Sequence, residues 1–229
     1  MIRNLLIMIT ASLGIQGSLI CQTIDRPNSA LKSHETLEIK KIVLSESGTD
    51  VYLKIENRIS KGTFCADRNI YIVYPGGEKM HIIASDGIPV CPDTYSFKRV
   101  GEQLDFVLKF PPLEKGTGYI NIIEECQDNC FSFYDVILDN DLNRKIDAAI
   151  SYAEKDEPAR AVLELTPIAA VNSGTAGPAD GLLFLSLVKL YSGLGNKVKA
   201  AEWYRKIETS GLPEAGLYLK HLNSLGIKY

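Results

Sequence analysis

The side chains that most often act as general bases or metal ligands are few and scattered in this 229-residue chain. The three histidines are His34, His81 and His221, and none has a carboxylate or a second histidine at the spacing of a zinc-binding helix. The chain also lacks a G-x-S-x-G elbow, a P-loop and a G-x-G-x-x-G turn, which gives no support to serine hydrolysis or nucleotide binding. We therefore expect a protein that is not an enzyme and that uses no metal or other cofactor.

Two groups of acidic residues have the chemistry to bind calcium or to cleave a glycosidic bond. Asp135, Asp139 and Asp141, with Asn140 and Asn143, form the first group. Counted from Asp139, the spacing begins like an EF-hand loop, but the Gly and the final Glu that such a loop needs are missing. We interpret this stretch as the N-terminal cap of a helix and a solvated domain junction. Glu124 and Glu125 are adjacent on an expected strand and point to opposite faces, which does not suit a catalytic pair.

The cysteines favour disulfide bonds over metal or redox chemistry. Of the five, Cys21 ends a targeting segment, and Cys65, Cys91, Cys126 and Cys130 remain as an even number typical of an oxidising compartment. The polar turn between Cys126 and Cys130 closes at little cost in loop entropy, which leaves Cys65 with Cys91. Their spacing lacks the paired knuckles of a structural zinc site. We predict two structural disulfides.

The first 21 residues have the layout of a secretory signal peptide. Arg3 is followed by an apolar run over residues 5–15, which is about half as long as the ~20 residues that a membrane-spanning helix needs. Cleavage before Gln22 competes with a loose lipobox in which Cys21 becomes a lipidated N-terminus, and Ile20 disfavours the lipobox because it is not small. We expect an exported protein, periplasmic or extracellular, that meets a membrane only if Cys21 is lipidated.

The composition indicates a folded protein and argues against nucleic-acid binding. The chain is 45% hydrophobic and 23% charged, so it can bury a core. The formal net charge is −3 and the isoelectric point is near 5.7. Because the lysines and arginines are also spread along the chain, the basic footprint of a nucleic-acid binder is missing.

From residue 36 to residue 138 the hydrophobic pattern has a period of two. Apolar and polar residues alternate over 51–56 and over 104–110, which predicts half-buried strands. Seven or eight such short strands, separated by Gly and Pro turns, predict an antiparallel β-sandwich of immunoglobulin-like type. Residues 22–35 carry no such pattern and are expected to form a linker. The unit formed by 122–125 and 131–134 is loosely similar to β-sandwich modules of secreted bacterial proteins.

From residue 139 to residue 229 the period changes to 3.6, which predicts five helices. A Gly, Ser and Pro loop over 172–178 and a break at 211–213 divide them. Two helix-turn-helix units recur 39 residues apart, and here the chain resembles a tetratricopeptide repeat. The second copy has the family's large, Leu, aromatic, Gly, Ala and aromatic positions at their usual spacing: Phe184, Leu187, Tyr191, Gly195, Ala200 and Tyr204. We therefore expect a β-sandwich followed by TPR-like helical hairpins.

The resemblance implies a helix-pair scaffold that binds a peptide or a protein. In that family the first helix of each pair lines the groove, which gives the candidate contacts Asn143, Ile146, Ile150, Leu185, Lys189 and Ser192. Trp203 lies on the second helix of the better copy, where it either packs in the core or anchors a partner.

We therefore expect one of two functions for the protein. The first is a secreted, non-enzymatic adaptor that presents a TPR-like protein-binding surface joined to a disulfide-bonded β-sandwich. The alternative is a carbohydrate- or small-ligand-binding module that uses sandwich loops near residues 71–74 and 95–97, with the helices as a spacer. A hydrolase is the weakest interpretation, because nothing places a nucleophile beside a base.

Overall fold

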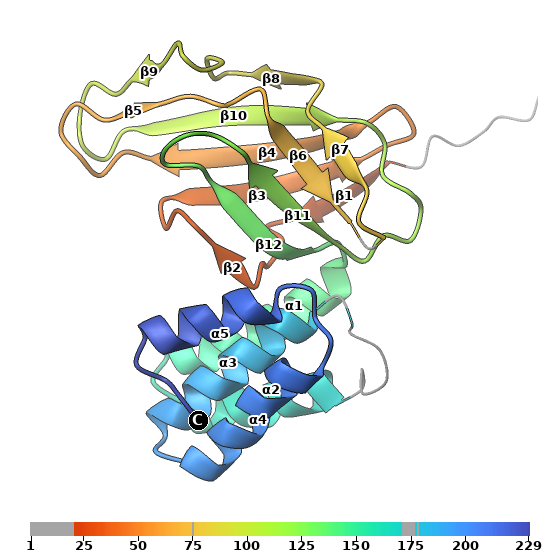
Figure 1. The fold of residues 1–229 in the computed structure, drawn as a ribbon, viewed down its shortest axis with the longest axis vertical. Helices are drawn as coiled ribbons and strands as arrows, with labels where there is room; N and C mark the ends of the chain where they lie inside the picture. Colours follow the sequence, from red (N-terminus) through yellow and green to blue (C-terminus); the bar gives the residue numbers. More distant parts are fainter. Residues whose placement is uncertain (1–20, 75, 171–176, 178) are drawn as a thin grey trace, which may run out of the picture.

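The structure is a computed structural model that describes residues 21–74, 76–170, 177 and 179–229 (Figure 1). Within these residues the chain forms twelve strands, most of them in antiparallel sheets, and then five α-helices. The predicted order of a β part followed by a helical part is therefore confirmed. Apart from Cys21, the predicted signal peptide lies outside the described residues, as does most of the predicted loop over 172–178.

The first sheet has five strands in the order β1, β3, β4, β10, β8. In chain order they are β1 (Gln22–Asp25), β3 (Leu37–Leu44), β4 (Thr49–Glu56), β8 (Ala84–Asp86) and β10 (Gln103–Phe110). Along β4 every second residue is buried, as the alternating pattern predicts. The other residues of β4 face outward, so this sheet has one apolar and one polar side.

The second sheet also has five strands, in the order β2, β12, β11, β6, β7. They are β2 (Leu31–Lys32), β6 (Ile70–Val73), β7 (Lys79–His81), β11 (Tyr119–Glu124) and β12 (Ser132–Ile137), and a separate pair joins β5 (Thr63–Phe64) to β9 (Tyr95–Ser96). Buried residues of both sheets, such as Leu53 and Phe106 from the first and Ile72 and Ile122 from the second, belong to one hydrophobic cluster. The β part therefore has a single core to which both sheets contribute.

The expected linker over residues 22–35 contains β1 and β2 instead. Ile24 of β1 is fully buried, and β1 pairs with β3 from Gln22 opposite Leu44. β2 pairs with β12 and forms one edge of the second sheet. Strands of four and two residues are too short to show a period in the sequence, and only their pairing with longer strands reveals them.

Both predicted disulfides are present. Cys65 is bonded to Cys91, and Cys126 is bonded to Cys130. The first pair joins the segments after β5 and before β9, and the second closes the turn between β11 and β12. Cys21 is exposed and has no disulfide partner among the described cysteines.

The helical part consists of two helix pairs and a final helix (Figure 1). The helices are α1 (Asn140–Glu154), α2 (Pro158–Ala170), α3 (Asp180–Gly193), α4 (Lys197–Thr209) and α5 (Ala215–Ser224). The expected cap is present, because the Asp139 side chain accepts hydrogen bonds from the backbone N–H groups of Asp141 and Leu142. None of the helices in the described ranges is long and apolar enough to cross a bilayer.

We predict that removing the two disulfides has unequal effects on stability. Replacing Cys65 and Cys91 by Ser frees a loop with a sequence separation of 26, which should lower the free energy of unfolding by about 3–4 kcal/mol. Replacing Cys126 and Cys130 frees a separation of only 4 and should cost about 2 kcal/mol, because less loop entropy is released. Urea unfolding of the chain from Cys21 onward measures both losses. Equal losses would show that loop entropy is not the source of the stabilisation.

Candidate functional site

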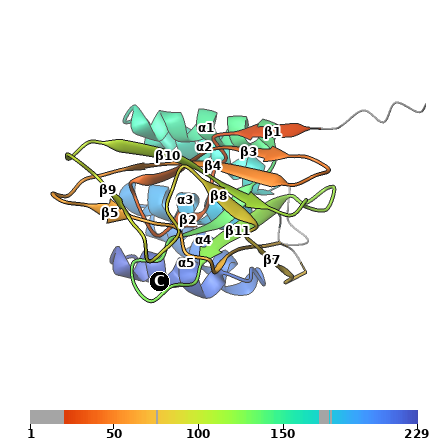
Figure 2. The same ribbon diagram turned by 90° about the horizontal axis from the view of Figure 1, so that it is seen from above.

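The first helices of the pairs and the final helix turn one common face toward the β part. Seen from above, α1 and α5 lie on opposite sides and α3 lies between them (Figure 2). Ile137 of β12 belongs to the hydrophobic cluster of the helices, and Ala30 and Leu31 pack against that cluster. The face that would line a peptide groove in a TPR-like scaffold is therefore partly covered by the protein's own β12 and β2.

Asn143 fixes the position of α1 against the β part. Its side-chain amide donates to the backbone oxygen of Ile137 at 3.0 Å and accepts from the backbone N–H of Asn28 at 3.0 Å. The Asn28 side chain in turn donates to the carboxylate of Asp147 at 2.8 Å, one turn further along α1. Asn143 is thus a buried structural residue that uses its hydrogen-bonding groups inside the molecule.

A buried polar cluster joins β12 to α3 and α5. Tyr218 of α5 donates a short hydrogen bond from its hydroxyl to Oδ2 of Asp135. Nδ2 of Asn121 donates to Oε1 of Glu214 at 2.6 Å, and Oδ1 of Asn121 accepts from the backbone N–H of Asp135 at 2.8 Å. Asn121 therefore links the strand that carries Asp135 to the start of α5.

A β-bulge directs Asp135 toward the helices. The pairing of β11 with β12 shifts between Ile120 and Ile122, so that β12 has one extra residue at this point. Asp135 has a φ of +49°, a left-handed conformation that Asp tolerates better than most residues. Its side chain is only 2% exposed.

Gly181 allows α3 to approach this cluster. A Cβ atom at this position would collide with the Asp135 carboxylate and would lie 2.6 Å from the Tyr218 hydroxyl oxygen. The first turn of α3 therefore sits directly on the Asp135 and Tyr218 side chains, and only Gly leaves room for it.

The environment of Asp135 opposes its ionisation. Burial raises its pKa to about 6, and the carboxyl groups of Glu214 and Asp180 contribute in the same direction, whereas the hydrogen bond from Tyr218 opposes the shift. Oδ1 of Asp135 and Oε2 of Glu214 are buried and accept no hydrogen bond within the described part of the chain. Burial, followed by the charge of Asp135, also raises the pKa of Tyr218, which keeps its hydroxyl as a donor.

The predicted contact residues differ in their exposure to solvent. Asn143, Ile146, Leu185 and Trp203 are buried in the protein's own core, so they are not accessible to a partner. Trp203 packs on Phe184 with a ring separation of 5.5 Å. Asn143, Ile146 and Leu185 follow the helical period of the face that would line a groove. The period alone does not reveal which other part of the protein covers that face.

Three of the predicted contacts remain at or near the surface. Ile150 and Ser192 are half-buried and Lys189 is exposed. Ser192 lies 2.8 Å from the hydroxyl of Tyr229, so the C-terminal residue partly covers it. Burial and the nearby charge of Lys189 lower the pKa of His221, which places these two side chains near each other on α3 and α5.

The loops expected to bind a carbohydrate do not present open aromatic rings. Tyr71 and Phe97 are buried, and Tyr74 and Tyr95 are partly buried against the core of the β part. Tyr71, Tyr74 and Tyr95 each donate a hydrogen bond to a glutamate of the same protein. Rings held in this way offer little stacking surface to a sugar.

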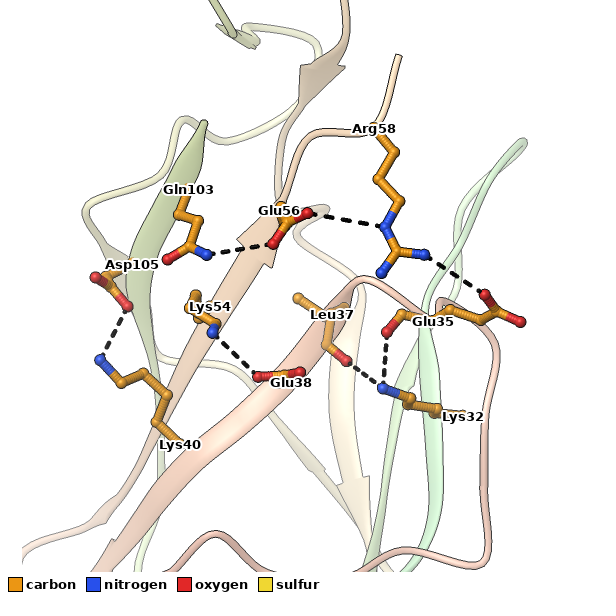
Figure 3. A network of polar contacts seen from close by, with 10 residues as sticks. All are labelled: Lys32, Glu35, Leu37, Glu38, Lys40, Lys54, Glu56, Arg58, Gln103 and Asp105. Carbon is orange, nitrogen blue, oxygen red and sulfur yellow. Dashed lines mark hydrogen bonds and ion pairs between the residues drawn. The ribbon is translucent and has the colours of Figure 1, made fainter. Parts of the chain in front are cut away.

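A groove of about 840 Å³ runs over the outward side of the first sheet. Its floor is crossed by ion pairs between strands. Lys54 of β4 lies 3.2 Å from Glu38 of the neighbouring β3, and Lys40 of β3 reaches across β4 to Asp105 of β10, also at 3.2 Å (Figure 3). Tyr52 supplies an aromatic ring with the Lys41 ammonium 4.4 Å from its centre. The groove is thus a polar surface of mixed charge and carries no concentrated charge of one sign.

The described residues contain no candidate metal centre. Within them, no three Asp, Glu, His or Cys side chains come together as ligands for a metal ion. Comparisons of the chain with known protein families, with curated proteins and with solved structures find no match. We therefore infer function from the surfaces of the molecule itself.

We predict that Gly181→Ala destabilises the protein by about 1–3 kcal/mol, because the added methyl group overpacks the contact with Tyr218 and Asp135. Gly193→Ala is the matched control in the same helix. A Cβ atom at Gly193 meets nothing within 4 Å, so this change should leave stability unaltered or raise it by up to about 1 kcal/mol. Thermal unfolding followed by circular dichroism compares the two, and equal stability would contradict the close approach of α3.

We also predict that Asp135→Asn stabilises the protein at neutral pH. Because the folded-state pKa of Asp135 lies near 6, above its ordinary value of 3.8, ionisation favours the unfolded chain. This loss of stability is absent at low pH, where Asp135 is protonated in both the folded and the unfolded chain. It grows as the pH rises from about 4 to about 6 and reaches its full size above that range. The amide has no charge to bury and tolerates the left-handed conformation, so the gain at pH 7–8 should approach about 3 kcal/mol.

The measurement is urea unfolding from pH 4 to pH 8. Near pH 4 the Asp135→Asn gain should largely vanish. Asp93→Asn, at an exposed position of the β part, is the control and should change stability little at any pH. A gain that did not depend on pH would rule out the ionisation of Asp135 as its source.

Proposed function

We propose that the protein is an exported, non-enzymatic adaptor that binds a protein partner through its helical part. The two disulfides fit an exported protein. The observation that carries the proposal is the docking of α1, α3 and α5 on the β part through buried contacts. This docking holds the uncovered remainder of the same helical face in one orientation, as a surface for a partner requires.

The proposed architecture is an immunoglobulin-like β-sandwich followed by two TPR-like helical hairpins. The shared core of the two sheets supports the first part. The second part is supported by equivalent positions of the two helix pairs. Asp156 and Gly195 both take a left-handed φ in the turn within their pair, and Ala161 and Ala200 are both fully buried on the following helix.

The proposed contact surface surrounds Lys189. It comprises Lys189 and His221, with the half-buried Ser192 and the exposed Tyr229 beside them. A cation next to an imidazole and two hydroxyl groups favours a partner that presents carboxylates or backbone carbonyls.

A second candidate function is the binding of a small polar ligand in the groove of the first sheet. The groove volume of about 840 Å³ and the ring of Tyr52 at its wall favour it. For this function we propose the groove in place of the loops near residues 71–74 and 95–97, because the aromatic rings of those loops are covered. Weaker ligand binding by Tyr52→Ala on a glycan array would support this candidate, whereas the adaptor function does not depend on Tyr52.

We predict that Lys189→Glu abolishes partner capture in chemical cross-linking of the protein in its native host. Loss of an attractive charge and gain of a repulsive one at a contact should lower the captured amount at least about tenfold. Lys197→Glu, at an exposed position of α4, is the matched control and should capture the same species as the unaltered protein. Identical capture by both variants would remove the surface around Lys189 from the proposal.

A further inference from the structure

Two loops at one end of the β part are joined into a single tip. The loop over residues 57–62 follows β4 and the loop over residues 97–102 precedes β10, whose first residue pairs with the last residue of β4. The backbone N–H of Asn57 donates to the oxygen of Glu102 at 2.9 Å, and the backbone N–H of Gly101 donates to the oxygen of Asn57 at 2.7 Å. Phe97 also donates from its backbone to Gly62 at 2.9 Å. We call these two loops the tip.

Asn57 and Glu102 hold the tip together from inside. Asn57 is only 5% exposed, and its Nδ2 donates to the backbone oxygen of Arg99 at 2.8 Å. The carboxylate of Glu102 accepts from the backbone N–H of Lys98 at 2.7 Å and from the hydroxyl of Tyr95 at 2.7 Å. A side chain at Gly62 would collide with Asn57. The polar groups of the tip that point inward are therefore bonded, and its shape is preorganised.

Apart from Ser60, the exposed side chains of the tip are basic or aliphatic. Ile59 is 66% exposed and Val100 is 59% exposed, one from each loop. They are flanked by four exposed cations, Arg58, Lys61, Lys98 and Arg99. Arg58 lies 3.8 Å from Glu35 and 3.9 Å from Glu56, which are loose contacts at the edge of the charged sheet face (Figure 3). The tip is thus a concentration of positive charge on a chain whose formal net charge is −3.

We propose that the tip binds the surface of an anionic lipid bilayer. The four cations complement acidic headgroups, and the two aliphatic side chains at the apex can enter the boundary between headgroups and acyl chains. Single-stranded nucleic acid is a poorer match, because it is bound on aromatic rings and Phe97, the aromatic residue of these loops, is buried. An acidic protein would neutralise the cations but offers no reason for two exposed aliphatic side chains between them.

The tip is distinct from an anchor at the N-terminus. β1 begins at Gln22, which pairs with Leu44 at the far end of the first sheet, whereas the tip lies where β4 ends and β10 begins. In Figure 1 the two loops are on the left and β1 is on the right. Membrane contact through the tip can therefore be tested without any contribution from Cys21.

The test is cosedimentation of the chain from Cys21 onward, carrying Cys21→Ser, with vesicles of phosphatidylcholine alone or mixed with phosphatidylglycerol. We expect binding to the mixed vesicles at low salt, loss of binding at high salt through screening, and no binding to phosphatidylcholine alone. Lys61→Glu combined with Lys98→Glu should weaken binding at least about tenfold, because each cation near an anionic surface contributes about fivefold in affinity.

Two further double variants serve as a control and a second test. The first controls for the change in net charge, and the second tests the contribution of the two aliphatic side chains. Lys197→Glu combined with Lys220→Glu makes the same charge change at exposed positions of α4 and α5 and should leave binding within about twofold of the parent. Ile59→Ser combined with Val100→Ser keeps every charge and should weaken binding severalfold. All these side chains are exposed, so thermal unfolding should show folded proteins in each case.

Absence of binding by the parent chain would overturn the proposal, and so would equal losses in the two charge-reversal variants. Binding to heparin without binding to the mixed vesicles would also overturn it and would assign the tip to a soluble polyanion.

Discussion

The arrangement of the two parts of this protein depends on burying the Asp135 carboxyl group beneath the hydroxyl of Tyr218. A bulge in β12 directs the carboxyl group out of its sheet, and Gly181 lets the first turn of α3 lie against it. The cluster also contains Asn121 of β11 and Glu214 at the start of α5, so four secondary-structure elements, β11, β12, α3 and α5, meet around a few polar groups. The hydrogen bonds within this cluster favour one geometry, because an arrangement that broke them would leave buried polar groups unbonded.

This contact determines which helical surfaces remain for a partner. Docking on the β part covers Asn143 and the first turns of α3 and α5, whereas Lys189 on α3 stays exposed. A TPR-like groove would offer its whole length to a peptide. Here the protein's own strands occupy part of that face, and the proposed partner surface is the remainder.

The β part distributes its charges in two different ways. On the outward side of the first sheet, cations and carboxylates from different strands are paired. Lys54 is paired with Glu38 on the adjacent strand, and Lys40 of β3 is paired across β4 with Asp105 of β10 (Figure 3). Such cross-strand pairs keep an exposed sheet soluble and contribute little attraction for a charged partner. At the tip, the Glu102 carboxylate bonds inward to the backbone of its own loop, and the cations beside it face solvent. The proposed membrane contact follows from this difference.

The sequence by itself determined the order of the β and helical parts, five helices, the Asp139 cap and the pairing of the four cysteines. Each depends on periodicity, a cap or a short loop, which are properties of neighbouring residues. Only the tertiary structure decided that residues 22–35 form strands, that the helical face is covered and that two loops join into one tip. Asp135 and Tyr218 are 83 residues apart, and their contact depends on how complete elements pack, which no local pattern records.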